Sequence, residues 1–177
     1  MTDLLRLVVL YEEGGVYLDT DVLVVRSLAP LGNVLGYQDS HHVNGAVLKF
    51  ERRSEYLRAC IQEFLATYDP TKWGFNGPGL LTRVLAQPRF RANQTLVTAL
   101  PMPVFYPFAE GSRIIRKCFT ATNASAKNLQ VIVRSAYTVH LNGKWSSETK
   151  AQNGSVCHTL LSQNRLARCG GEGGSSS

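Results

Sequence analysis

The sequence predicts an α/β fold, because a helical pattern leads directly into two short apolar segments that favour strands. An apolar stripe with helical spacing runs through residues 2–13, and two glycines follow it. Valine, leucine and tyrosine then dominate residues 16–18 and 22–25, as in buried strands. Sites in α/β domains form where strands end at their carboxyl side. We therefore expect a functional site directly after residue 18.

Two carboxylates, Asp19 and Asp21, stand between these two apolar segments. If the chain is extended there, their side chains share a face and their Cα atoms lie roughly 6.5–7 Å apart. Both could then bind one divalent ion, or one could bind the ion and the other the substrate. An ordinary surface turn is less favoured, because four apolar residues follow at once without Gly, Asn or Pro. Oxygen ligands favour Mg²⁺ or Mn²⁺ over zinc.

The composition indicates one globular domain with a glycine- and serine-rich tail. The chain has 177 residues, of which 44% are hydrophobic, and its mean hydropathy is near zero. Residues 169–177 carry almost nothing to bury, so we expect a disordered tail there and a domain over residues 1–168. The net charge of +6 is a weak hint of anionic partners such as nucleotide diphosphates. Basic residues are scattered without interleaved aromatics, which argues against nucleic acid.

Cysteines and glycosylation signals bear on the compartment. No Cys-x-x-Cys pair occurs, which argues against zinc, and the four cysteines can pair in three ways: Cys60, Cys118, Cys157 and Cys169. Three N-glycosylation signals, at Asn93, Asn123 and Asn153, favour the secretory lumen. The longest apolar run near the start, residues 7–11, is far shorter than the ~20 residues that cross a membrane.

Further elements follow along the chain. Residues 35–38 and 43–50 resemble strands. A helix with Ser54 as its N-cap is expected to follow and to end before Asp69-Pro70, because apolar residues recur there with helical spacing: Leu57, Cys60, Ile61, Phe64, Leu65 and Tyr68. A glycine-rich loop, 73–79, opens a short helix over 80–86. Prolines predict an irregular segment around 101–107, a strand spans 136–141, and a last helix spans 155–168.

Three more residues are candidates for the site, each with a structural alternative. Asp3 and Arg6 lie one helical turn apart and could form only a surface ion pair. His140 is a lone histidine at a strand end, and such histidines are more often structural. Its neutral imidazole could nevertheless complete a metal shell begun by Asp21. A phosphatase with Asp19 as nucleophile and Asp21 as acid/base would need a later acidic pair, and no aspartate follows Asp69.

Several short motifs occur in one order: Asp3-Leu-Leu-Arg6, Leu10-Tyr11, Gly14-Gly-Val-Tyr-Leu-Asp-Thr-Asp21, Asn44-Gly-Ala46, Trp73-Gly74, Gly77-Pro78, Leu80-Leu-Thr-Arg-Val84, Phe105-Tyr106-Pro107 and Val139-His140. Over roughly residues 2–145 the chain resembles the glycosyltransferases with an Asp-x-Asp (DXD) motif. These include α-1,4-galactosyltransferases of globo-type glycolipids and α-1,4-N-acetylglucosaminyltransferases. Residues 44–56 are especially similar to the galactosyltransferase branch.

This resemblance implies a partial GT-A-type α/β fold and a retaining, metal-dependent transfer. The expected donor is a UDP-sugar carrying galactose or N-acetylglucosamine, the acceptor a glycan or glycolipid, and the new linkage α-1,4. The expected cofactor is Mn²⁺ or Mg²⁺, and the expected location is the Golgi lumen. The family's uridine-binding portion precedes the Asp-x-x-Arg helix, so residues 1–168 are expected to be a truncated domain with an open sheet edge. A membrane anchor would lie in the missing portion.

The resemblance also assigns roles residue by residue. Asp21 corresponds to the usual direct metal ligand, and Asp19 to the aspartate that contacts ribose, sugar or metal-bound water; both are candidate catalytic and metal residues. His140 corresponds to a histidine that reaches the metal or diphosphate. The implied donor-binding residues are Asp3, Arg6, Asn44, Asn76, Gly77 and Lys144.

This chain departs from the family at two of these motifs. After His140 it has Leu-Asn-Gly-Lys-Trp where the family has Trp-Asn-Lys, and Asn76 stands where glutamine is common. No residue stands out as a nucleophile, so front-face attack and double displacement both remain open. The alternative function is an inactive remnant that binds glycans or a partner.

Overall fold

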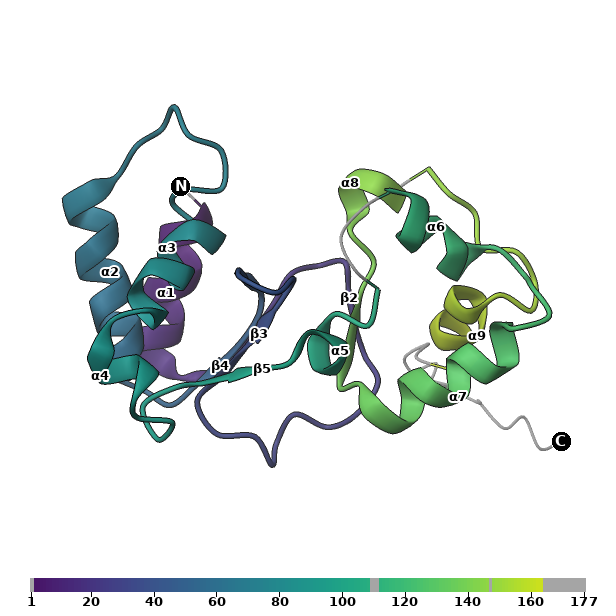
Figure 1. Cartoon of the computed structure of the whole chain (residues 1–177), viewed down its shortest axis with the longest axis horizontal. Helices are drawn as coiled ribbons and strands as arrows, with labels where there is room; N and C mark the ends of the chain where they lie inside the picture. Colours follow the sequence, from purple (N-terminus) through teal and green to yellow (C-terminus); the bar gives the residue numbers. More distant parts are fainter. Residues whose placement is uncertain (1, 109–111, 147, 164–177) are drawn as a thin grey trace, which may run out of the picture.

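The strands lie between two groups of helices at opposite ends of the molecule (Figure 1). The computed structural model describes residues 2–108, 112–146 and 148–163. Each group of helices has its own buried core, and a third buried cluster lies around the strands. The predicted tail and the end of the predicted last helix lie outside the described residues.

The first group of helices packs beside a four-stranded sheet. Its members are α1 (Thr2–Glu13), α2 (Glu55–Thr67), α3 (Pro78–Leu85) and α4 (Pro88–Arg91). The sheet has the order β1-β4-β3-β5, formed by β1 (Gly15–Leu18), β4 (Val43–Phe50), β3 (Val34–Tyr37) and β5 (Thr98–Leu100). β4 is antiparallel to both of its neighbours, whereas β5 is parallel to β3. Among the described strands, β1 and β5 are the edges of this sheet.

The second group of helices lies beside a two-stranded ribbon (Figure 1). It comprises α6 (Ser112–Phe119), α7 (Ser125–Ser135), α8 (Gly143–Ser146) and α9 (Val156–Gln163), while the short α5 (Met102–Phe105) lies between the two groups. The ribbon pairs β2 (Val22–Val24) antiparallel with β6 (Thr138–His140), so that Val22 lies opposite His140. The chain therefore passes from the first group to the second between β1 and β2.

Aromatic residues organise the first core. The ring of Tyr56 on α2 stacks on Phe50 at 5.4 Å and meets the edge of Phe90 at 5.3 Å. The buried Tyr56 hydroxyl donates a hydrogen bond to the Leu81 carbonyl at 2.7 Å. This contact fixes α3 against α2, and with it the loop that precedes α3.

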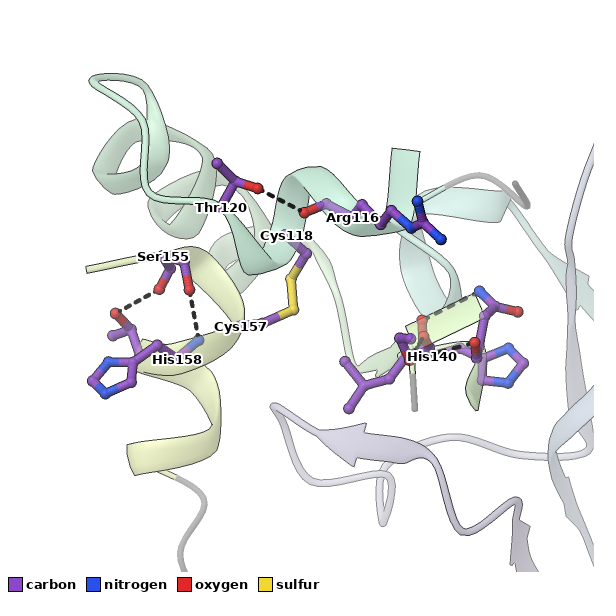
Figure 2. Close-up of a disulfide and its surroundings, with 11 residues drawn as sticks. Arg116, Cys118, Thr120, His140, Ser155, Cys157 and His158 are labelled. Carbon is purple, nitrogen blue, oxygen red and sulfur yellow. Dashed lines mark hydrogen bonds between the residues drawn. A yellow bond between two sulfur atoms is a disulfide. The ribbon is translucent and has the colours of Figure 1, made fainter. Parts of the chain in front are cut away.

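A disulfide joins two helices of the second core. Cys118 on α6 bonds to Cys157 on α9, and Figure 2 shows this bond in one view with His140 of β6. Of the pairings left open by the sequence, the structure contains this one, while Cys60 is a free, buried thiol. Val139 of β6 belongs to the same buried cluster as both bonded cysteines.

The start of α2 contains one correction. Ser54 precedes α2 as predicted, but its hydroxyl is buried and makes no capping bond among the described residues. At the other end of this helix, Leu65 and Tyr68 are 72% and 52% exposed, although they continue its apolar spacing. No described helix combines the length and apolar character needed to cross a bilayer.

Candidate functional site

Asp19 and Asp21 lie in a tight turn that connects β1 to β2. The Val22 N–H donates to the Asp19 carbonyl at 3.1 Å, which closes the turn. The prediction of extended chain here was wrong, because β1 pairs with β4 and β2 pairs with β6, and the chain bends as it changes sheets. The two carboxylates nevertheless meet at one place, where each is partly buried.

His140 lies beside Asp21 because β2 and β6 pair. Its Nε2 is 3.2 Å from Asp21 Oδ1, and the Gly143 N–H donates to Asp21 Oδ2 at 2.6 Å. Asn142 has a φ of 51° and turns the chain so that Gly143 faces the carboxylate. The hydrogen bond with His140, aided by Gly143 and opposed by burial, lowers the pKa of Asp21 to about 2. Asp21 is therefore an anion at neutral pH.

Asp19 is held from the other side by Tyr17 and Arg6. The Tyr17 hydroxyl donates to Asp19 Oδ1 at 2.7 Å, and Arg6 Nη1 donates to the same oxygen at 3.2 Å. The Arg6 guanidinium also lies over the Tyr17 ring, 4.7 Å from its centroid. Burial, followed by the bond to Asp19, raises the pKa of Tyr17 to about 12, so this phenol is a neutral donor.

The Asp3–Arg6 pair belongs to the same cluster and is more than a surface ion pair. Arg6 Nη2 lies 3.3 Å from Asp3 Oδ1, and Nη1 donates to the Gly45 carbonyl at 3.0 Å. The Arg6 side chain is only 15% exposed, and its buried Nε has no hydrogen-bond partner among the described residues. Gly77 packs against this pair, because a Cβ there would lie 3.0 Å from Asp3 Oδ1.

The donor set fits a divalent metal ion. Asp19, Asp21 and His140 each offer a ligand atom, and these atoms all lie within 4.8 Å of one another. Two carboxylates and an imidazole are common ligands of divalent metal ions. The anionic Asp21 needs no deprotonation before it binds an ion at neutral pH.

An adjoining cleft of ≈ 580 Å³ brings most of the predicted site residues together. Those among its lining residues are Asp3, Arg6, Asp19, Asn44, Asn76, Gly77 and His140. The Asn76 amide is already used, because it bonds both the N–H and the carbonyl of Asp69 and thereby closes the loop. The side chain of Lys144 lies outside the described residues.

The structure also places residues in the cleft to which the sequence gave no role. Gln38 and His42 line it, and Gln38 accepts a bond from the Asn44 amide at 2.7 Å. Trp73 lines it too, from the glycine-rich loop. Tyr17 could have been found from its position, since residues i and i+2 on a strand share a face and Asp19 follows it.

A turn with two aspartates, completed by a histidine and facing a cleft with a glycine-rich wall, defines a candidate metal-dependent transferase site. Residues 1–41 match the glycosyltransferase sugar-binding region containing the DXD motif. Residues 49–165 match the alpha 1,4-glycosyltransferase conserved region. The chain belongs to this alpha-1,4-glycosyltransferase family. This family membership argues against the alternative of a phosphatase.

Named relatives agree with this family. The chain is 36% identical to mouse (Mus musculus) lactosylceramide 4-alpha-galactosyltransferase over 177 residues, which cover 96% of this chain and 47% of the relative. It is 35% identical to the human (Homo sapiens) protein of that name over 178 residues, covering 96% and 48%. Human alpha-1,4-N-acetylglucosaminyltransferase is 34% identical over 84 residues, covering 48% and 24%. The chain thus spans about half the length of the two galactosyltransferases. No solved structure matches it.

Proposed function

We propose that this chain carries the catalytic region of a metal-dependent, retaining hexosyltransferase. It moves galactose or N-acetylglucosamine from a UDP-sugar to a glycan or glycolipid acceptor and forms an α-1,4 linkage. The observation that carries this proposal is the meeting of Asp19, Asp21 and His140 at a cleft that also holds the Asp3–Arg6 pair. The names of the relatives support both sugars, since they include a galactosyltransferase and an N-acetylglucosaminyltransferase.

The proposed cofactor is Mn²⁺ or Mg²⁺, held by Asp21, Asp19 and His140. When bound, such an ion supplies positive charge that stabilises a departing diphosphate. The protein's own part is to keep this shell in place. The Gly143 N–H orients Asp21, while Tyr17 and Arg6 fix Asp19. The contact between His140 and Asp21 holds these two proposed ligands side by side.

The proposed donor-binding residues are Asp3, Arg6, Asn44, Asn76, Gly77 and Lys144. Arg6 is the best supported, because it lines the cleft while its terminal nitrogens hold Asp3 and Asp19. Asn76 acts through the loop that it closes, and Gly77 lets that loop approach Asp3.

We place the protein in the Golgi lumen, with membrane association through a segment outside this chain. The Cys118–Cys157 disulfide supports an oxidising compartment, and the asparagines of all three glycosylation signals are exposed. Treating extracts of expressing cells with peptide N-glycosidase should therefore speed the migration of the protein in gels. Unchanged migration, with a glycoprotein control that responds, contradicts this location.

The function is tested by calorimetry and by transfer. Mn²⁺ and UDP should bind the chain, and UDP-galactose should react with lactose only when Mn²⁺ is present. Asp21→Asn keeps the shape of the side chain but removes its charge, so we expect Mn²⁺ affinity to fall by at least tenfold and transfer to be abolished. Unchanged Mn²⁺ binding and turnover in this variant would remove the metal role.

A glycan- or partner-binding module without catalysis is the second candidate, because the chain spans about half the length of its relatives. This candidate predicts that neither UDP nor Mn²⁺ binds to the chain. The same calorimetric titrations therefore distinguish the two functions.

A further inference from the structure

The loop that forms one wall of the cleft has a fixed backbone. The Asn76 amide bonds both main-chain groups of Asp69, at 3.0 and 2.7 Å, and the Gly79 N–H donates to the Gly74 carbonyl at 2.9 Å. Arg83 on α3 stacks 3.9 Å from the Phe75 ring centroid and donates to the Phe75 carbonyl at 3.1 Å. Residues 69–79 therefore present their side chains from a rigid frame.

Trp73 differs from the other aromatic residue of this loop. Phe75 is covered by Arg83, whereas the side chain of Trp73 lines the cleft and is 91% exposed, the largest fraction among the exposed large hydrophobic residues described. Burying more of such an exposed apolar ring against a ligand is favourable in water.

The cleft is lined by charged groups and by two aromatic rings. Asp3 and Arg6 line it together with the proposed metal ligands Asp19 and His140, where the charged donor is expected. The loop wall contributes Trp73 and Phe75, with Lys72 lying 5.1 Å from the Phe75 ring centroid. A neutral sugar fits such a wall, because its C–H face packs against the electron-rich face of an indole and its rim of hydroxyls remains free for polar partners. His42 and Gln38 supply polar groups to the same cleft.

We propose that the indole of Trp73 is the platform on which a neutral hexose ring of the acceptor stacks. This inference rests on the proposed function, and it separates the two substrates: the carboxylate cluster receives the nucleotide sugar, and Trp73 receives the acceptor. The fixed loop backbone holds Trp73 at the cleft, so stacking has to order the indole side chain but not the loop.

The exposure of Trp73 has a competing explanation: Trp73 could form an apolar surface that contacts a membrane together with Leu65 and Tyr68, which are also exposed at the end of α2. The position of Trp73 in the cleft lining favours the sugar, because neither Leu65 nor Tyr68 contributes to that lining. Leu65→Ala is therefore a matched control: it removes an exposed apolar side chain that is nearby in sequence but outside the cleft.

Lactose is the probe, and the full chain is used throughout. The chain has two tryptophans, so Trp73→Ala assigns the two indole N–H signals in an NMR spectrum. Lactose should shift the Trp73 signal saturably in the wild type and in Leu65→Ala. In transfer assays, Trp73→Ala should raise the KM for lactose at least tenfold, with the KM for UDP-galactose and its hydrolysis unchanged. Trp73→Phe, which keeps a ring, should restore part of the affinity.

An unshifted Trp73 signal at saturating lactose, or an unchanged lactose KM in Trp73→Ala, overturns the proposal. The proposal is also overturned if Trp73→Ala and Leu65→Ala lose phosphatidylcholine vesicle binding equally and lactose has no effect on that binding. This result would assign Trp73 to a membrane-contacting surface. Failure of the wild type to bind UDP and Mn²⁺ refutes the proposed catalysis instead, and the lactose titration still decides the role of Trp73.

Discussion

The candidate site depends on how single charged groups are balanced. Asp3, Asp19 and Asp21 would repel one another if they stood alone. Arg6 lies between Asp3 and Asp19, while His140 and the Gly143 N–H contact Asp21. Each carboxylate therefore has a partner that is not one of the proposed metal ligands: Arg6 for Asp3 and Asp19, and the Gly143 N–H for Asp21. An oxygen of Asp19 or Asp21 can turn to a metal without leaving the others uncompensated.

Gly36 packs against two aromatic rings, one of which contacts His140, and this packing leads to a prediction. A Cβ at Gly36 would lie 2.8 Å from a ring carbon of the buried Phe105 and 2.9 Å from one of Tyr106, whose ring packs against His140. We expect Gly36→Ala to lower the free energy of unfolding by about 1–3 kcal/mol, because neither ring has space to move away. Urea unfolding measures this, and Mn²⁺ affinity should fall with it because Tyr106 supports His140.

Gly32→Ala is the matched control, because a Cβ there meets nothing within 4 Å. It should leave the unfolding free energy and Mn²⁺ affinity within error of the wild type, or raise stability slightly by restricting the unfolded chain. If both substitutions prove equally neutral, the contact between Gly36 and the two rings does not constrain the site.

At the scale of helices and strands, local patterns identified the elements near the site. Residues 2–13 show a clear apolar period of 3.6, and α1 has the predicted bounds. Residues 43–50 form β4 with the predicted bounds, and nearly all of them are buried. Helices α6 and α7 were not predicted, since each is only two to three turns long and offers little apolar spacing to recognise. The capping role of Ser54 failed because its hydroxyl turns into the interior.

The pairing of elements could not be obtained from such patterns. Asp21 and Gly143 are 122 residues apart, and they meet only because β2 pairs with β6. Motif order, through a family resemblance, placed His140 near the metal, whereas local sequence offered only a histidine at a strand end. The role of the Gly143 N–H required the register of the strands, which no single segment encodes, whereas that of Tyr17 follows from its place two residues before Asp19.

On the scale of the whole molecule, the proposed metal shell is divided between the two groups of helices. Asp19 and its partners Arg6 and Tyr17 come from α1 and β1, while His140 and Gly143 come from β6 and α8 (Figure 1). The second group is small and is stapled by the Cys118–Cys157 bond, which closes a segment with a sequence separation of 39 (Figure 2). The disulfide thus stabilises the group that delivers the histidine.

Reducing this disulfide should therefore weaken both the fold and the metal site. Loops of this size lose about 2–4 kcal/mol of stability when opened, which corresponds to a fall in Tm of roughly 5–15 °C. We expect a phosphine reductant to lower the Tm of the wild type by this amount and to weaken Mn²⁺ binding in calorimetry. The doubly substituted Cys118→Ala/Cys157→Ala protein should start from the lower Tm and show no response to the reductant, since Cys60 is not bonded. The opposite result is that the reductant frees the thiols of Cys118 and Cys157 but changes neither the Tm nor the Mn²⁺ affinity of the wild type. It would show that strand pairing between β2 and β6 alone positions His140.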